Sequence, residues 1–208
     1  EKKFNTLQIS GVENIGYIIY HSDNRPVAYY GIFPVFASIN KKKILTGQSG
    51  DTMTVPAHTG LGLFIASARL THQLCIQNGI QGVFGFPSPP SFRTFKKKLD
   101  WKFNENIIKY TFKIPAIPAA YFAAKIKFLM IPYLWWVKLV ILFYRKSGFF
   151  EGSVIGNGQD GILRDKAFWN YKMRSDGIFA IRTRGTEVII KTNGTLSIGD
   201  VNISNETD

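Results

Sequence analysis

The 208-residue sequence predicts a mixed α+β fold, and three observations support this prediction. Residues 15–55 contain runs rich in β-branched and aromatic side chains, separated by polar turns, as expected of strands. Residues 60–78 repeat apolar side chains every three or four positions, as expected of a helix. A short apolar run and a proline-initiated helical segment follow, up to residue 99. Strands that precede and follow a helix in this way predict a central mixed sheet with helices packed on it.

The first strands are predicted at residues 15–20 and 26–39, with the polar turn 21–25 between them. A third strand is predicted from Lys43 to about Val55, after another polar turn. Because each turn is short, the three strands should form an antiparallel meander.

The helix predicted over residues 60–78 should be mostly buried against the sheet, and Asn78-Gly79 predicts a left-handed stop at its end. Residues 81–86 then read as a short strand, which should be parallel to the preceding one because a helix connects them. Ser88 before Pro89 predicts the N-cap of a helix that ends near Leu99. Residues 101–114 alternate well enough for one or two further strands.

The composition changes after residue 117, and residues 121–144 are dominated by apolar and aromatic side chains. Lysines precede and interrupt this segment, so its uninterrupted apolar part is short for a membrane span. Three interpretations stay open: packing between domains, contact with a membrane surface by an interfacial helix or a hairpin broken at Pro132, and a true span. The glycine-rich residues 148–161 predict a linker, followed by a helix at 164–174 and strands at 178–182 and 187–191. We therefore expect units at 1–117, 118–147 and 148–208.

Lysine and arginine total 26 against 14 acidic residues, which gives a formal net charge of +12. Such an excess favours an anionic partner. The sequence has no zinc-finger, helix-turn-helix or RNA-binding aromatic signature, so nucleic acid is not the expected partner. Its three histidines lack partners at metal-ligand spacing, and we expect no metal site. Cys75 is the single cysteine, which favours a reducing compartment and a buried structural thiol over a catalytic one.

Gly60 and Gly62 mark a candidate phosphate site where the predicted strand turns into the helix. They leave the backbone bare, so the unpaired N–H groups of the first helical turn can approach an anion. An ordinary tight turn explains the same glycines. The better-known nucleotide motifs do not fit, because Ile65 stands where a dinucleotide fingerprint needs a small residue and no Gly-Lys-Ser/Thr follows.

Two segments carry a resemblance to a known superfamily. The stretch Pro56-Ala57-His58-Thr59-Gly60-Leu61-Gly62-Leu63-Phe64 resembles the Pro-x-x-Arg-Gly-x-Gly-Leu-Phe turn of the GNAT acyl-CoA-dependent N-acetyltransferases. Gly85-Phe86-Pro87, Ser91, Phe95 and Lys97-Lys98-Leu99-Asp100-Trp101 are similar to the Gly-Phe-Pro-Asn…Ser…Phe…Lys-Leu-Gly-Trp pattern of a bacterial subgroup. The resemblance covers residues 15–114 and implies a GNAT-like domain at 1–117 without its N-terminal helices. Residues 148–208 loosely resemble the entry to a second such unit.

The resemblance implies that acetyl-CoA is the cosubstrate and that its pantetheine arm lies between two splayed strands. Main-chain groups of Met53, Thr54 and Val55 would bind that arm. Ser88 and Phe95 would lie beside it, with Ser88 in place of the subgroup's Asn. N–H groups of residues 58–63 would bind the pyrophosphate, and these residues are His58, Thr59, Gly60, Leu61, Gly62 and Leu63. Since Thr59 replaces the usual Arg, a cationic contact is lost and weaker affinity is expected unless a lysine cluster compensates.

The implied reaction is attack of a neutral amine on the thioester, with a backbone N–H near Met53 polarising the carbonyl. Asp51 is the candidate base, with a plain turn or sheet-edge carboxylate as the alternative. Phe95 stands where the family often has a Tyr that protonates the departing thiolate, so Ser91 or a water must do so. The acceptor implied by the subgroup is an amino sugar or another cell-envelope precursor.

Three functions therefore stay open: an acyltransferase, a GNAT-like module that binds CoA or a partner without turnover, and a membrane-surface interaction protein. The sequence begins with Glu1 and shows no secretory leader, which we interpret as a fragment or processed bacterial chain. We expect it in the cytoplasm, and peripheral contact of residues 121–144 with the inner membrane face is one of the interpretations that stay open.

Overall fold

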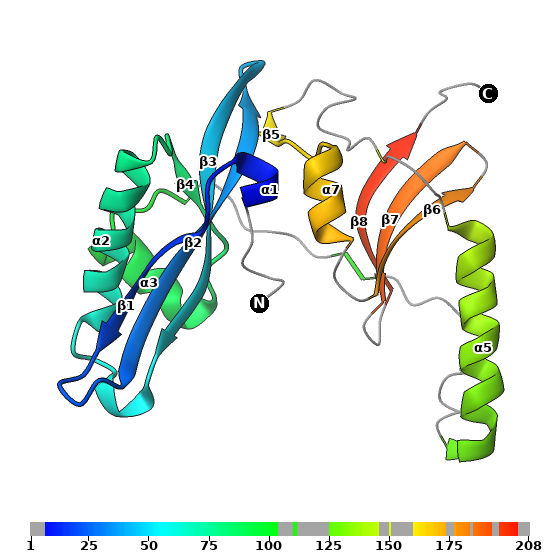
Figure 1. Cartoon of the computed structure of the whole chain (residues 1–208), viewed down its shortest axis with the longest axis horizontal. Helices are drawn as coiled ribbons and strands as arrows, with labels where there is room; N and C mark the ends of the chain where they lie inside the picture. Colours follow the sequence, from blue (N-terminus) through cyan, green and yellow to red (C-terminus); the bar gives the residue numbers. More distant parts are fainter. Residues whose placement is uncertain are drawn as a thin grey trace. The chain divides into compact units, whose positions relative to one another are not determined.

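A computed structural model describes most of the chain and shows a mixed α+β fold, as predicted. It describes residues 7–103, 110–111, 125–145, 150, 160–173, 177–183, 185–192 and 196–203. The chain divides into two compact units, Glu1–Phe103 with Glu151–Asp176 and Asn104–Phe150 with Gly177–Asp208. Figure 1 labels the elements of both units.

The first unit is built on a sheet with the strand order β1-β2-β3-β4, and a short β5 pairs with the far end of β2. The β1–β2 and β2–β3 pairs are antiparallel, whereas β3 and β4 are parallel, so the predicted meander and the predicted parallel strand are both confirmed. The elements of this unit are α1 (Leu7–Ser10), β1 (Ile15–Tyr20), β2 (Pro26–Ile39), β3 (Lys42–Thr54), the 3₁₀ turn η2 (Pro56–His58), α2 (Leu63–Gln77), β4 (Val83–Phe84), α3 (Pro89–Lys98), β5 (Gly161–Ile162) and α7 (Lys166–Lys172).

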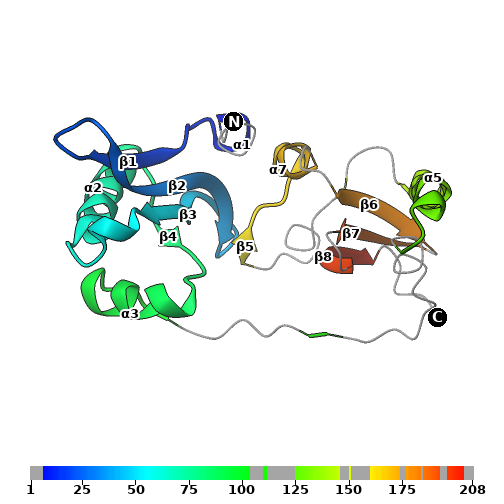
Figure 2. The ribbon, with the colours of Figure 1, turned by 90° about the horizontal axis from the view of Figure 1, so that it is seen from below.

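Helices α2 and α3 pack against one face of this sheet, while α1 and α7 lie on its other side (Figures 1 and 2). The core between α2, α3 and the sheet is apolar and rich in aromatic side chains. Its buried members are Ile15, Tyr30, Ile32, Ala68, Cys75, Ile80 and Phe95. Burial of these side chains fixes which face of β2 and β3 points toward the helices.

Only one stripe of α2 is buried, so the expectation that this helix is mostly buried was too broad. Ala68, Thr71 and Cys75 are buried at helical spacing, whereas Leu70 is 40% exposed and Ile76 74% exposed. Gly79 follows the helix with φ +74°, which confirms the predicted left-handed stop.

β5 and α7 belong to the first unit, although the sequence analysis grouped their residues with 148–208. β5 pairs with Ala37 and Ser38 of β2, and α7 contacts α1. α7 is a short helix that begins at the N-cap Asp165, whose carboxylate accepts a bond from the Phe168 N–H at 2.9 Å.

The second unit contains an apolar helix and a three-stranded antiparallel sheet with the order β6-β7-β8. The third strand, β8, was not predicted. The elements are α5 (Lys127–Tyr144), β6 (Ile178–Thr183), β7 (Thr186–Thr192) and β8 (Leu196–Ile203). α5 runs through Pro132 without a break, so the alternative of a hairpin broken at that residue is wrong. No described helix combines the length and apolar content needed to cross a bilayer.

Parts of two predictions lie outside the described residues. The strands expected at 101–114 fall largely on 104–109 and 112–114, and residues 101–103 are not in a strand. The linker expected at 148–161 falls largely on 151–159.

Candidate functional site

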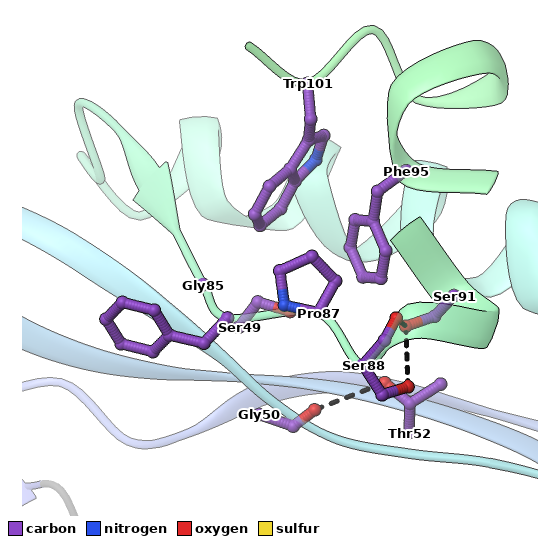
Figure 3. Close-up of a pocket in the computed structure, with 10 residues that line it drawn as sticks. Ser49, Gly50, Thr52, Gly85, Pro87, Ser88, Ser91, Phe95 and Trp101 are labelled. Carbon is purple, nitrogen blue, oxygen red and sulfur yellow. Dashed lines mark hydrogen bonds between the residues drawn. The ribbon is translucent and has the colours of Figure 1, made fainter. Parts of the chain in front are cut away.

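A cavity of about 190 Å³ lies where β3 and β4 separate. The two strands pair only at Gly47–Val83 and Gln48–Phe84, after which β3 continues while the chain after β4 turns toward α3. Figure 3 shows the residues around the resulting gap. The lining residues are Ser49, Gly50, Thr52, Gly85, Phe86, Pro87, Ser88, Ser91, Phe95 and Trp101.

A β-bulge in β3 lies at the wall of this cavity. Gly50 and Asp51 together oppose the single residue Gly31 of β2, because the register changes between Tyr30–Thr52 and Ile32–Ser49. A Cβ at position 50 would lie 1.9 Å from the Phe33 ring, so a larger residue there would displace that ring. In a regular strand, side chains three positions apart point to opposite faces. The extra residue of the bulge brings the side chains of Ser49 and Thr52 to the same face, where both line the cavity.

The bulge also determines which peptide groups of β3 face the gap. Before it, Gly47 N–H donates to Gly82 C=O at 2.9 Å on the β4 side. After it, Val55 N–H donates to Val27 C=O at 2.9 Å on the β2 side. Because peptide groups of an antiparallel strand alternate between its two neighbours, those of Thr52 and Thr54 point toward the side where β4 has ended. An extended ligand chain could pair with this edge.

The turn between η2 and α2 presents backbone N–H groups at a helix N-terminus. Gly60 and Gly62 have φ +84° and +76°, and a Cβ at either would meet nothing within 4 Å. Gly62 is the N-cap and provides no side-chain cap, so the N–H groups of the first turn, starting at Leu63, lack a partner from within the helix. The exposed turn and the positive end of the helix dipole suit an anion.

Two of the predicted phosphate-binding residues use their N–H groups within the turn. His58 N–H donates to Val55 C=O at 2.8 Å, and Thr59 N–H donates to Pro56 C=O at 3.2 Å. The Thr59 hydroxyl also donates to Pro56 C=O, at 2.7 Å. The imidazole Nδ1 of His58 is buried and has no hydrogen-bond partner within the described part of the chain. The backbone N–H groups that remain available to an anion are therefore those of Gly60, Leu61, Gly62 and the first turn of α2.

Ser88 and Ser91 lie together at the start of α3 and line the cavity, as Figure 3 shows. Ser91 Oγ donates to Ser88 C=O at 3.0 Å, and the two hydroxyl oxygens are 3.0 Å apart. With the Ser91 proton directed to that carbonyl, the Ser88 hydroxyl donates to Ser91 Oγ. Both protons are then used inside the turn, so the two oxygens are better placed to accept hydrogen bonds from a ligand than to donate them.

Phe95 lines the cavity as part of the core. It is 5% exposed, and its ring centroid lies 4.6 Å from Trp101 and 5.3 Å from Phe64. A side chain packed in this way can form an apolar wall but cannot donate a proton.

Asp51 does not line the cavity. It lies at the bulge near Tyr29. The pKa of Tyr29 is raised mainly by burial and also by the negative charge of Asp51. Tyr29 points away from the face that carries Tyr30 and the core. Met53, also predicted for the site, pairs with Tyr29 and is 48% exposed. The structure thus brings Ser88, Ser91 and Phe95 together, and places Asp51 apart from them.

Sequence reasoning did not assign Ser49, Tyr30 or His72 to the site, although Ser49 lines the cavity and bonds to Tyr30. Tyr30 is fully buried, and its hydroxyl donates to Ser49 Oγ at 2.8 Å and lies 3.4 Å from His72 Nε2. The missed signal was a Tyr in the middle of an apolar strand, because a buried Tyr hydroxyl needs a polar partner. Among the described residues, no group of three or more His, Cys, Asp or Glu is placed to hold a metal ion.

The fold and site define a mixed α+β protein with an exposed, uncapped helix N-terminus beside an open strand edge. No family model matches the sequence. No curated protein matches it either.

Among solved structures, part of the chain is similar in fold to acetyltransferases. One is a Trypanosoma brucei acetyltransferase, at 17% identity and TM-score 0.41, with 48% of this chain and 69% of that chain covered. Another is glucosamine-6-phosphate N-acetyltransferase from Arabidopsis thaliana, at 13% identity and TM-score 0.41, with 48% of this chain and 67% of that chain covered. A third is an aminoglycoside 6'-N-acetyltransferase from Acinetobacter haemolyticus, at 17% identity and TM-score 0.39, with 49% of this chain and 71% of that chain covered. With identities this low and TM-scores below 0.5, what those proteins act on does not transfer to this chain.

Proposed function

We propose that the chain binds acetyl-CoA and transfers its acetyl group to a small amine, with an amino sugar as the expected class of acceptor. The observation that carries the proposal is the separation of β3 and β4, which leaves the peptide groups of Thr52 and Thr54 facing a gap beside a helix N-terminus. A CoA molecule needs both features, since its pantetheine arm carries amides and its pyrophosphate carries negative charge.

In this proposal each part of the cofactor meets a different part of the site. The pyrophosphate accepts N–H groups from Gly60 to the first turn of α2. The amides of the pantetheine arm pair with the Thr52 and Thr54 edge of β3, and Ser88 and Ser91 accept from them on the opposite wall. The thioester lies against Phe95, where a low-polarity wall strengthens nearby hydrogen bonds.

Asp51, the expected base, does not line the cavity, so in this proposal it acts at a distance from the thioester and not on the attacking amine. Its carboxylate would attract a protonated amine before the reaction. Attack forms the N–C bond and breaks the C–S bond, so the electron pair and one proton must reach the sulfur.

Calorimetric titration with acetyl-CoA tests the proposal. Gly60→Glu places a carboxylate in the proposed pyrophosphate turn, whereas Gly79→Glu makes the same change at the other end of α2. The two positions match, because both have positive φ and open space for a side chain, so the strain is similar. We expect binding to fall about 10-fold or more in Gly60→Glu and to persist in Gly79→Glu. No binding by the wild type, or equal losses in both variants, would contradict the proposal.

A second function is favoured by the surface of α5. We propose that this helix contacts an anionic membrane surface, because Trp135 is 67% exposed, Phe128 81% and Phe143 84%, and the cations Lys138 and Arg145 are exposed beside them. Such a helix suits the interface between headgroups and acyl chains.

Co-sedimentation with phosphatidylglycerol vesicles, compared with phosphatidylcholine vesicles, tests this second function. Leu139→Glu should abolish binding, whereas Ile76→Glu, an exposed apolar position on α2, should not change it. Equal binding by both variants, or a chain that instead forms dimers through α5, would refute the membrane contact.

A further inference from the structure

A hydrogen-bonded chain of three side chains leads from the cavity into the core. Ser49 lies on β3 at the cavity wall, Tyr30 lies behind it on β2, and His72 lies on α2. The Tyr30 hydroxyl is 2.8 Å from Ser49 Oγ and 3.4 Å from His72 Nε2. The Tyr30 and His72 rings meet edge to face, with centroids 5.7 Å apart.

Packing holds this chain in place. Tyr30 is fully buried between the Phe64 and Phe95 rings, at 5.7 and 6.4 Å. Trp101, which also lines the cavity, has its ring 6.3 Å from His72. Tyr30→Phe would keep the ring in this packing and remove only the hydroxyl that links Ser49 and His72.

We propose that Ser49, Tyr30 and His72 form a proton shuttle that serves the cavity side of the acyl-transfer site. This inference rests on the proposed function. It supplies a step for which the other cavity residues are poorly suited, since Phe95 has no proton and the Ser88 and Ser91 protons are used within their turn.

The shuttle balances the reaction without a further reactant. In the structure the Tyr30 hydroxyl donates to Ser49 Oγ. Rotation of the two hydroxyls gives the starting arrangement of the shuttle, in which Ser49 donates to Tyr30 and Tyr30 donates to the His72 Nε2 lone pair. When the amine attacks the thioester, its proton passes to Ser49 Oγ, the Ser49 proton passes to Tyr30, and the Tyr30 proton passes to His72 Nε2. The chain then points the other way, with His72 as imidazolium. As the C–S bond breaks, the same shifts in reverse deliver the proton to the thiolate sulfur. Hydroxyl rotation and the two imidazole tautomers allow both directions.

The electrostatic surroundings agree with this geometry. Burial lowers the pKa of His72, which favours the neutral imidazole that can accept a proton from Tyr30. Burial raises the pKa of Tyr30 to about 12, so its phenol passes protons without ionising. The other titratable group that acts on Tyr30 is the Cys75 thiol of α2, whose pKa burial raises to about 11 and which therefore stays neutral.

The test measures release of CoA thiol from acetyl-CoA with glucosamine as acceptor, across pH 5–9, for the wild type and for Ser49→Ala, Tyr30→Phe and His72→Gln. General acid–base groups contribute about 10²–10⁴-fold, so we expect kcat to fall by about 10²-fold with KM for acetyl-CoA unchanged. The ratio of variant to wild-type kcat should also vary with pH, with the midpoint at the His72 pKa measured by NMR. Titration of the amine itself is common to all variants and cancels in this ratio.

Two controls separate the outcomes. Thr71→Val removes a neighbouring buried hydroxyl on α2 that is not one of the three shuttle groups. This variant should leave kcat within a few-fold of wild type. Asp51→Asn tests the alternative base. Thermal unfolding checks each variant, and Ser49→Ala carries the test if Tyr30→Phe does not fold.

Normal turnover in the three variants, or a pH-independent ratio, would overturn the shuttle while the proposed function stands. Loss of the acidic limb in Asp51→Asn but not in His72→Gln would also overturn it. If the wild type binds no acetyl-CoA in the calorimetric titration, the proposed function fails and the shuttle fails with it.

Discussion

The protonation state of His72, behind the cavity, affects the stability of the fold. Burial lowers the pKa of His72, so the unfolded state binds a proton more readily than the folded state below about pH 6.5. The stability that this group contributes is therefore present above that pH and is lost as the pH falls through the folded-state pKa.

We accordingly expect the wild type to lose free energy of unfolding between pH 7 and pH 5, and His72→Gln to lose less. Urea unfolding of both proteins at the two pH values measures this difference. Parallel changes in the two proteins would show that His72 is not the titrating group.

A substitution at Thr59 can test the cationic contact that the proposed pyrophosphate turn lacks. Thr59 is exposed with φ −68°, a conformation that Arg adopts without strain. A charge-assisted bond to a phosphate adds about 1.5–3 kcal/mol, so Thr59→Arg should bind acetyl-CoA about 10-fold more tightly or better.

The control for this prediction is Thr59→Val, which removes the hydroxyl without adding charge and should not bind more tightly. Calorimetry in low and high salt measures both variants, because the added affinity should shrink as salt screens the charge. A gain that is absent, or that is independent of salt, would argue against a phosphate at this turn.

The gap between β3 and β4 depends on a small residue in the chain that leaves β4. A Cβ at Gly85 would lie 2.9 Å from Ser49 Cβ and 3.2 Å from the Trp101 ring, whereas a Cβ at Gly82 would meet nothing within 4 Å. Gly85→Ala should therefore cost about 1–3 kcal/mol of stability and weaken acetyl-CoA binding.

Gly82→Ala is the matched change before β4 and should leave both quantities nearly unchanged. Thermal unfolding and calorimetry of the two variants provide the comparison. If Gly85→Ala keeps full stability and binding, the gap is wider or more adaptable than the structure indicates.

At the scale of elements, the sequence was most informative where local signals agree. The alternating strands, the two glycines before α2 and the Ser88-Pro89 start of α3 each predicted their element correctly. β8 was missed although Leu196, Ile198, Val201 and Ile203 carry a strand pattern, because a register shift opposite Ile189 and Ile190 interrupts the alternation.

Pro132 is a second place where the local pattern and the structure differ. Proline removes one hydrogen bond and usually kinks a helix, and a hairpin was therefore considered. In the structure the helix continues through this residue, since a single lost bond in a strongly helical segment does not require a turn.

At the scale of the whole molecule, pairing between distant segments could not be predicted from local pattern. β5 joins the sheet of the first unit from residues 161–162, far along the chain. The chain of Ser49, Tyr30 and His72 likewise unites three elements that no motif connects. The bulge at Gly50 and Asp51 decides which side chains face the cavity, and this register choice also depends on the partner strand.

The net charge of +12 gives a prediction for the whole chain. Acetyl-CoA is anionic, so its association should be steered by the positive field and slowed by salt. Stopped-flow association rates at 20 and 300 mM salt, roughly spanning a Debye length of about 20 to 6 Å, measure this effect. Rates that do not change with salt would place the cationic excess away from the site.

The most direct measurement of the central claim is NMR mapping of backbone amides during titration with CoA. We predict the largest shifts at Thr52 and Thr54, which face the gap, and at Gly60 and Gly62, with smaller shifts at Val55, whose N–H bonds to β2. Shifts confined to the exposed lysines 41–43 and 96–98 would indicate non-specific binding of an anion. That result would contradict a cofactor site between β3 and β4.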